Sequence, residues 1–307
     1  MDQSNQTSPD IFFLIKLTNI PNLQPICFFI FLIMYIITLS GNILLLAVVR
    51  VNTQLQTPMY FFLCNLSFID ICFSSSIVPK ILVNTLSVDT SISLLGCAFQ
   101  MYISLVLGTT ECLILSVMAY DRYVAICSPL HYNTIMNKKR CIYLAAGSWI
   151  VCLINPIIHV FFIFQLPYCK SHHLNHFFCE VPAFFPISCK DTWLNKLLMY
   201  ISTGIVAMCP FIVIIVSYVY IISTILKIKS SKSRHKTFST CASHLIVVSL
   251  YYSTIMIMYM RPHSSYSPET DNVLSVLYTT ATPMMNPIIY SIRNKEVKNT
   301  IKKKLSK

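Results

Sequence analysis

The chain has 307 residues, of which 55% are hydrophobic and only 11% are charged, and its formal net charge is +12. About a quarter of the residues of soluble globular proteins are charged, so this composition excludes an ordinary soluble domain and favours a membrane protein. The positive charge does not indicate a nucleic-acid-binding protein, because the basic residues gather in short segments between long apolar stretches.

Seven apolar stretches follow one another along the chain, and only two of them carry an internal acid, Asp70 and Glu111. Each is long enough for the roughly 20 residues with which a helix crosses the hydrocarbon of a bilayer. The predicted spans are residues 26–49, 58–80, 94–120, 141–164, 197–226, 238–260 and 273–292. We therefore expect an all-α membrane protein, a bundle of seven transmembrane helices occupying residues 26–292.

The basic residues predict the orientation of the bundle, because cytoplasmic loops are enriched in Lys and Arg. If the N-terminus is outside, the inner segments hold seventeen of the 23 basic residues, including Arg122, the run Lys138 to Arg140 and the cluster from Lys227 to Lys236. The sequence therefore predicts an extracellular N-terminal segment, residues 1–25, and a cytoplasmic tail, residues 293–307.

Each terminal segment carries one recognisable pattern. Asn5-Gln6-Thr7 is an N-glycosylation sequon on the predicted extracellular side, so we expect Asn5 to be glycosylated. In the tail, Val297, Ile301 and Leu305 recur every four residues among lysines. This spacing predicts a short amphipathic helix lying on the anionic cytoplasmic leaflet.

Four cysteines lie on the predicted outer side, Cys97 at the start of the third span and Cys169, Cys179 and Cys189 in the long segment after the fourth. In an oxidising compartment four cysteines allow three pairings, among which their positions do not decide. The remaining nine cysteines lie in or next to spans and are expected to be packing residues.

Ionisable residues inside a bilayer are costly and are usually functional, which draws attention to Asp70 and Glu111. If they are close, the two carboxyl groups need a shared proton, a cation or polar neighbours, for which Asn42, Asn286 and Tyr290 are candidates. The group is either a polar core that rearranges between two arrangements of the helices or a static set of hydrogen bonds.

Asp121-Arg122 stands at the inner end of the third span. An acid beside Arg122 at the membrane boundary can hold the guanidinium in place, and its release would expose a cation at the cytoplasmic mouth of the bundle.

Several segments, in order and spacing, resemble the rhodopsin-like G-protein-coupled receptors and, within them, the odorant (olfactory) receptors. They are Gly41-Asn42 and residues 55–63 (LQTPMYFFL), 118–127 (MAYDRYVAIC), 217–218 (SY), 236–244 (KTFSTCASH) and 283–294 (PMMNPIIYSIRN). The resemblance covers essentially the whole chain. The sequence departs from the family pattern at Gln56, at Thr237 and at residues 251–254, where Tyr-Tyr-Ser-Thr replaces Phe-Tyr-Gly-Thr.

The resemblance implies a set of functional residues. It pairs Cys97 with Cys179 and Cys169 with Cys189, and it assigns G-protein coupling and switching to Asp121, Arg122, Tyr123, Tyr218, Asn286, Pro287 and Tyr290. It lines the ligand cavity with Ser104, Leu105, Gly108, Thr109, Cys112, Val181, Ser202, Val206, Tyr252, Ile255, Tyr259, Val276 and Thr279. Because this set has hydroxyls but no charge, and because Ser104 stands where receptors for amines have Asp, we expect a small, mostly neutral apolar ligand.

By the same resemblance, the receptor would act through a heterotrimeric G protein of the stimulatory type, raise cyclic AMP, and reside in the plasma membrane of the sensory cilia of olfactory neurons. The same scaffold sensing a non-odorant chemical signal is the alternative. A channel or transporter is more remote, because no inverted repeat, broken helix or charged pore lining is evident. No cofactor is expected, and no nucleophile and base pair or phosphate loop indicates an enzyme.

Histidines provide the remaining alternative. His172, His173 and His176 gather in the outer segment and could hold a transition metal, although His176-Phe177-Phe178-Cys179 matches the family pattern and favours a structural role. We therefore predict no metal site. His159, in the fourth span, is expected to be packed or hydrogen-bonded within the bundle.

Overall fold

The computed structural model describes residues 10–169, 171–259 and 268–293. The elements, in chain order, are β1 (Ile11–Leu14), η1 (Pro21–Leu23), α1 (Gln24–Val51), η2 (Thr53–Leu55), α2 (Pro58–Leu86), β2 (Ser91–Ser93), α3 (Leu94–Cys127), η3 (Pro129–His131), α4 (Tyr132–Ile135), α5 (Lys138–Phe164), β3 (His173–Leu174), η4 (Val181–Phe184), α6 (Trp193–Thr203), η5 (Gly204–Met208), α7 (Cys209–Leu226), α8 (Ser231–Tyr259), α9 (Pro268–Val276), η7 (Leu277–Ala281) and α10 (Thr282–Arg293).

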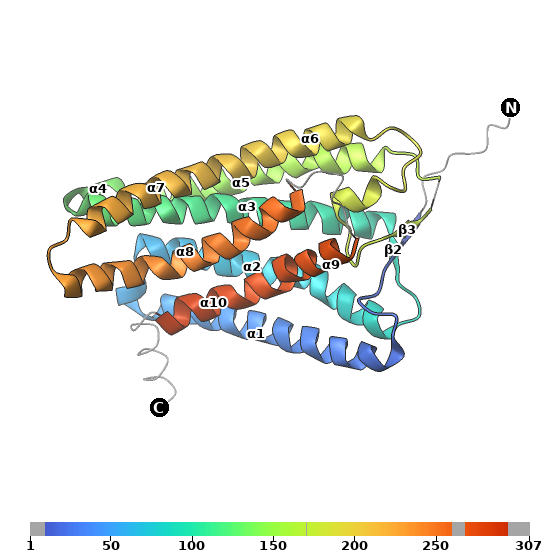
Figure 1. The fold of residues 1–307 in the computed structure, drawn as a ribbon, viewed down its shortest axis with the longest axis horizontal. Helices are drawn as coiled ribbons and strands as arrows, with labels where there is room; N and C mark the ends of the chain where they lie inside the picture. Colours follow the sequence, from blue (N-terminus) through green and yellow to red (C-terminus); the bar gives the residue numbers. More distant parts are fainter. Residues whose placement is uncertain (1–9, 170, 260–267, 294–307) are drawn as a thin grey trace.

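Six helical segments of the described chain are long and apolar enough to cross a bilayer, and they begin at Pro21, Pro58, Leu94, Lys138, Trp193 and Ser231. The next helical segment, α9, η7 and α10, runs without a break from Pro268 to Arg293. Its α10 contacts α1, α2 and α8. The fold is therefore the expected bundle of seven helical spans, which lie side by side along the long axis of the molecule (Figure 1).

Local sequence signals set the starts of three long helices. Pro58 occupies the first turn of α2, where its missing N–H leaves no hydrogen bond unmade. The Ser93 hydroxyl accepts the Gly96 N–H at 3.1 Å at the start of α3, and the Asn137 side chain accepts the Arg140 N–H at 2.9 Å at the start of α5. Each of these caps satisfies a backbone donor that the first helical turn leaves free.

The helices extend beyond the predicted spans on the inner side. The third span was predicted to end at residue 120, but α3 continues to Cys127, and α8 begins at Ser231 rather than at residue 238. The first turns of α8 carry exposed Lys232 and Arg234. Extending an existing helix into water requires no new nucleation, so these polar turns stay helical without apolar burial.

The third span lies at the centre of the bundle. In its most apolar window 67% of the residues of α3 are buried, against 28% for α1 and α5, and α3 contacts α2, α5 and α7. The outer faces of the peripheral helices expose large apolar side chains such as Ile33, Ile150 and Ile212. A soluble protein rarely exposes so much apolar surface, and in lipid these side chains have an apolar solvent.

A small sheet covers the end of the bundle that carries the disulfides, which we call the outer end. Its strand order is β2-β1-β3, with β1 antiparallel to β2 and parallel to β3. Phe12 of β1 is fully buried, and its ring contacts Phe164, Tyr168 and Phe184 edge-on. Strand β1 is therefore part of the outer end, a role that the sequence did not predict.

Candidate functional site

The segment Ser171–Thr192, between α5 and α6, covers the outer end of the bundle, and we call it the lid. Cys179 of the lid is disulfide-bonded to Cys97 of α3, with 5.5 Å between the Cα atoms. The side-chain Oε1 of Gln100 accepts the Cys179 N–H at 3.0 Å. A second disulfide joins Cys169 to Cys189. These are the two pairs that the resemblance implies; the first holds the lid against the start of α3, and the second ties the lid to the segment that follows α5.

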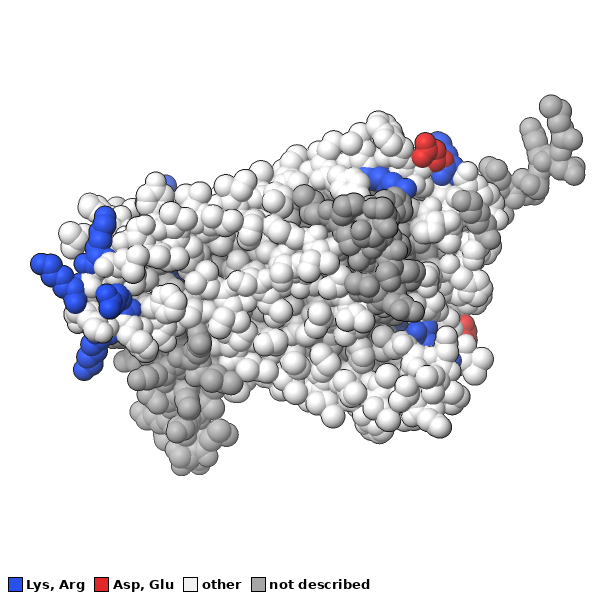
Figure 2. All heavy atoms as spheres, viewed as in Figure 1, with Lys and Arg blue, Asp and Glu red and all other residues white. Residues whose placement is uncertain are grey.

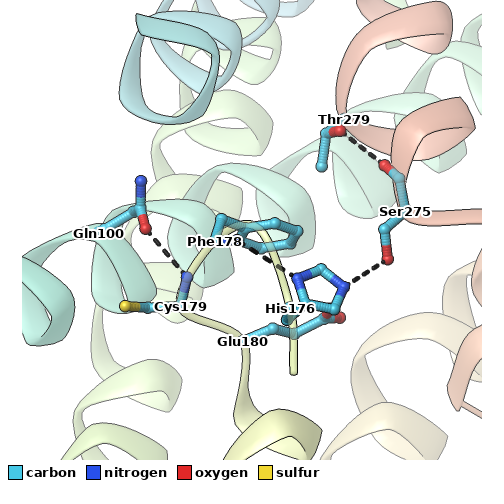
Figure 3. A network of polar contacts seen from close by, with 7 residues as sticks. All are labelled: Gln100, His176, Phe178, Cys179, Glu180, Ser275 and Thr279. Atoms are coloured by element: carbon cyan, nitrogen blue, oxygen red, sulfur yellow. Dashed lines mark hydrogen bonds and ion pairs between the residues drawn. The ribbon is translucent and has the colours of Figure 1, made fainter. Parts of the chain in front are cut away.

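His176 joins the lid to the seventh span (Figure 3). Its Nε2 lies 2.9 Å from the Ser275 hydroxyl and 3.2 Å from the Glu180 carboxylate, and its Nδ1 accepts the Phe178 N–H at 3.4 Å. Since Nδ1 is the acceptor, the hydrogen-bond network assigns the ring proton to Nε2. Burial lowers the pKa of His176 to about 4, so the ring is neutral at neutral pH.

The other two histidines of the lid point elsewhere. His172 and His173 are exposed, and the His173 ring stacks on Phe13 of β1 with 5.0 Å between centroids. Within the described ranges, no three His, Cys, Asp or Glu side chains are grouped so that they could hold a metal ion. The geometry gives the lid histidines separate contacts rather than a common ligand set.

A cavity of about 70 Å³ lies beneath the lid, between spans three, four, five, six and seven. The described residues that line it are Ser104, Leu105, Gly108, Thr109, Cys112, Asn155, His159, Val181, Met199, Ser202, Thr203, Val206, Ala207, Tyr251, Ile255 and Tyr278. None of these residues is Asp, Glu, Lys or Arg. The cavity is thus mostly apolar with a few hydrogen-bonding groups, the usual character of a site for a small uncharged molecule.

Nine of the residues that the resemblance assigns to the ligand line this cavity: Ser104, Leu105, Gly108, Thr109, Cys112, Val181, Ser202, Val206 and Ile255. Three others do not line it. Tyr252 donates its hydroxyl proton to the Cys112 carbonyl at 3.1 Å, Thr279 donates to the Ser275 carbonyl, and Val276 packs against the main apolar core. Tyr259 ends α8, and its side chain lies outside those the structure describes.

Seven cavity residues were missed by the sequence analysis: Asn155, His159, Met199, Thr203, Ala207, Tyr251 and Tyr278. A signal existed for two of them. Asn155 and His159 are polar residues four positions apart in an apolar span, so they share one helix face. The apolar members carried no comparable signal, because an inward-facing and a lipid-facing apolar residue look alike in sequence.

Two π-helical segments border the cavity, η5 in the fifth span and η7 in the seventh. Each inserts a wider turn that re-aims its side chains, and such segments are frequent at functional sites. Tyr278 of η7 reaches across to Gly108 of α3, where a Cβ atom would lie 2.6 Å from the tyrosine hydroxyl. Because Gly108 has no Cβ atom, the Tyr278 hydroxyl group can lie against α3 at this position.

The predicted polar core is present deeper in the bundle. The Asn286 amide donates to both oxygens of Asp70 at 3.1 Å and to Glu111 at 3.4 Å, and the three side chains are at most 3% exposed. The Asn42 amide donates to the Thr38 carbonyl and to the Pro283 carbonyl. Spans one, two, three and seven are thus joined through buried polar groups, and the two carboxyl groups share one amide.

We expected the Asp121 carboxylate to hold the Arg122 guanidinium in place, but the two groups, both among the described residues, do not form an ion pair in the structure. The Asp121 carboxylate accepts the Tyr132 hydroxyl at 2.9 Å instead. Adjacent residues of a helix point about 100° apart, so Asp121 and Arg122 do not face one another. The Arg122 Nε is buried and has no hydrogen-bond partner.

His244 ties the sixth span to the third and fifth spans near Arg122. Its Nε2 donates to the Leu115 carbonyl at 3.1 Å, so its Nδ1 accepts the Tyr218 hydroxyl proton at 2.7 Å. Tyr290 of the seventh span is buried there, and its hydroxyl has no partner. Two of the residues to which the resemblance assigns switching, Tyr218 and Tyr290, therefore lie near Arg122, with Tyr218 engaged by His244 rather than by Arg122.

Exposed basic residues surround this inner end. Lys138, Lys139 and Arg140 begin α5, and Lys227 and Lys229 follow α7. Figure 2 shows basic side chains gathered at one end of the molecule, a largely uncharged middle, and charges of both signs at the other end. This distribution is the one expected for a bundle whose middle contacts lipid.

Comparisons with known proteins agree with this geometry. A model of the olfactory receptor family matches residues 31–307. Olfactory receptor-like protein OLF1 of Canis lupus familiaris is 48% identical over 299 residues, 97% of this chain and 96% of that protein. The human olfactory receptors 5I1 and 5G3 are 47% and 44% identical, over 98% and 100% of this chain and 96% and 98% of their own lengths. The chain is therefore a multi-pass membrane protein that belongs to the olfactory receptor family, which is a family of receptors and not of enzymes.

Proposed function

We propose that this receptor binds a small, mostly neutral and apolar odorant in the cavity beneath the lid, and that binding activates a stimulatory-type heterotrimeric G protein and raises cyclic AMP. The observation that carries the proposal is the small cavity without formal charges, which contacts five of the seven spans. Burial of apolar area contributes about 25 cal/mol per Å², so a ligand that fits so little space binds with micromolar affinity.

The third span connects the ligand cavity to the site of G-protein coupling. Ser104 and Cys112 of α3 line the cavity, and Arg122 lies further along the same helix at the inner end. The odorant binds more tightly to the arrangement in which the inner part of α8 has swung outward, and so it shifts the population toward that arrangement. The shift breaks the His244 bond to the Leu115 carbonyl and opens a crevice beside Arg122.

Unpaired polar groups favour this opening. Arg122 Nε and the Tyr290 hydroxyl are buried without partners, and an unpaired buried polar group costs about 1–3 kcal/mol. In the open arrangement, Tyr218 is released from His244 and, with Tyr290, supports Arg122 at the site where the G-protein α-subunit docks. Asn286 and Pro287 of the seventh span and Tyr123 of α3 belong to the same switch. The polar core of Asp70, Glu111 and Asn42 rearranges with it.

The surroundings of the receptor follow from its charge distribution. The exposed basic residues at the inner end attract anionic lipid and acidic surface of the G protein. Residues 294–307 of the predicted amphipathic tail and the glycosylation site Asn5 lie outside the described residues, and the tail, residues 293–307, and Asn5 remain part of this proposal. We place the receptor in the plasma membrane of olfactory sensory cilia, with residues 1–25 outside.

The decisive variant is Arg122→Ala, measured with a cyclic AMP reporter in cells that expose equal amounts of receptor at the surface. We expect odorant-driven cyclic AMP to be abolished. Arg140→Ala is the matched control, because it removes one exposed guanidinium from the same end of the bundle while the other basic residues there still attract the G protein, and it should retain most of the response. An unchanged response in the Arg122 variant would show the mechanism to be wrong.

A further inference from the structure

His159 is a buried polar side chain in the cavity wall without a partner. It belongs to α5, is 8% exposed and lines the cavity beneath the lid. Its imidazole makes no hydrogen bond to any other described residue. Most buried polar groups in folded proteins are hydrogen-bonded, and an exception calls for a specific explanation. His159 was expected to be packed or hydrogen-bonded, and it is packed, without a hydrogen bond among the described residues.

Three hydroxyl groups of the cavity wall are already engaged with backbone. Ser104 donates its hydroxyl proton to the Met101 carbonyl at 3.0 Å, and Tyr251 donates to the Gly108 carbonyl at 2.5 Å. Thr109 donates to the Leu105 carbonyl at 2.6 Å. These hydroxyls have no proton left for a ligand, whereas the imidazole of His159 has both a donor and an acceptor nitrogen when it is neutral.

A polar pair lies beside His159 on the same helix face. Asn155 stands one turn earlier in α5, and its amide nitrogen donates to the Ser202 hydroxyl at 2.9 Å. The Ser202 hydroxyl in turn donates to the Asn155 carbonyl oxygen at 3.2 Å. The pair joins span four to span five and fixes the orientation of the amide, which keeps one N–H free for another acceptor. The wall formed by spans four and five is therefore the polar side of the cavity.

We propose that His159, supported by Asn155 and Ser202, is the hydrogen-bonding group that sets the specificity of the cavity. Its ligand is a small apolar molecule that carries one hydroxyl or carbonyl group, and the corresponding hydrocarbon is a poor ligand. The inference rests on the proposed function only in taking this cavity as the ligand site. A hydrocarbon would leave the imidazole buried and unpaired, whereas an alcohol or ketone satisfies it, and a site that pairs with a polar group rejects an analogue that lacks the group.

The test uses the full-length receptor in lipid nanodiscs and matched probes, each small carbon skeleton supplied as hydrocarbon, ketone and alcohol. Binding is measured as the probe-induced rise in Tm, and cyclic AMP is measured separately in cells. Oxygenated probes should bind about tenfold more tightly than their hydrocarbons, the effect of one satisfied hydrogen bond in a buried site. His159→Phe should remove this preference, and His159→Gln, which keeps a donor and an acceptor, should retain most of it.

Leu105→Val is the matched control, because it alters an apolar residue of the cavity wall. It should change the affinity for each hydrocarbon and its alcohol by the same factor. The proposal is overturned if no oxygenated probe binds, if hydrocarbons bind equally well, or if His159→Phe weakens every probe alike. Binding that depends on His159 without any cyclic AMP response supports the proposal and contradicts the proposed function. If the probes raise cyclic AMP with the same order of potency in the native receptor and in His159→Phe, the proposed function is supported and the role of His159 is contradicted.

Discussion

The outer and inner ends of the bundle are held together by different interactions. At the outer end, two disulfides, a three-stranded sheet and a cluster of buried aromatic rings join the lid and β1 to the helices. At the inner end, no disulfide joins the described spans: they pack through apolar side chains such as Ile221 and Val248, and their polar contacts near Arg122 are single hydrogen bonds, such as those of His244 to Tyr218 and to the Leu115 carbonyl.

The difference teaches where the molecule can change shape. Disulfides and packed aromatic rings resist rearrangement, because losing either one costs several kcal/mol of stability. A hydrogen bond contributes about 1 kcal/mol net and can be exchanged for another bond of similar strength. The outer end therefore encloses the ligand in a fixed frame, and the inner end is the part that can adopt a second arrangement.

The largest expected effect is loss of the Cys97–Cys179 disulfide. The two cysteines are 82 residues apart in sequence, for which the chain-entropy model gives about 4.5 kcal/mol. The value is smaller in a bilayer, where helical spans persist in the unfolded reference state. Cys97→Ala should therefore abolish surface expression, measured by flow cytometry. Cys209→Ala, at an exposed free cysteine, should leave expression unchanged, and equal loss in both variants would refute the special role of the disulfide.

The next effect concerns the sheet at the outer end. Phe12→Ala removes a fully buried ring that contacts three other aromatic rings, at a cost of about 3–4 kcal/mol. We expect the Tm of the purified receptor to fall by several degrees. Ile11→Ala changes the neighbouring residue of the same strand, whose side chain is 47% exposed, and should have little effect. Equal behaviour of the two variants would mean that the N-terminal strand does not contribute to the outer frame.

Phe12 also shows where prediction from sequence ends. The seven spans follow from hydropathy and charge, because crossing a bilayer imposes a length and a composition that a single sequence reveals. Phe12 lies outside every span, and its burial depends on Phe164, Tyr168 and Phe184, which are distant in sequence. Contacts between distant loops carry no periodic signal, so the sheet could not be foreseen.

The cavity was predictable in part for a related reason. Residues such as Gly108 and Ser202 were found through their positions in the family pattern. Tyr251 was visible as a departure from that pattern, but not as a cavity residue. His159 was expected to be packed or hydrogen-bonded, and its place in the cavity wall was missed, because the helix face on which a polar residue lies does not reveal whether a partner or a cavity lies opposite.

A smaller effect should appear on acidification, through the lid. In the unfolded lid His176 titrates with its ordinary pKa of about 6.5, whereas burial lowers the folded value to about 4. The unfolded state therefore binds the proton first, and stability is lost as the pH falls through this window. At about pH 5 the loss is about 2 kcal/mol.

Hydrogen exchange of the lid amides at neutral and acidic pH measures this effect. We expect protection to fall on acidification in the native receptor and to stay nearly constant in His176→Gln, which cannot titrate. His235→Gln, at an exposed histidine of α8, should behave as the native receptor does. A pH dependence that survives in His176→Gln would assign it to another group.

The smallest expected effect lies at the inner end, where one side chain joins three spans. His244→Phe preserves a ring at a fully buried position but removes the bonds to Tyr218 and to the Leu115 carbonyl. A loss of about 1 kcal/mol in the closed arrangement raises the population of the open one about fivefold. Basal cyclic AMP should increase by that factor at equal surface expression, and His235→Phe should change nothing. If basal signalling fell instead, the hydrogen bonds of His244 would belong to the open arrangement, and breaking them would close the crevice beside Arg122 rather than open it.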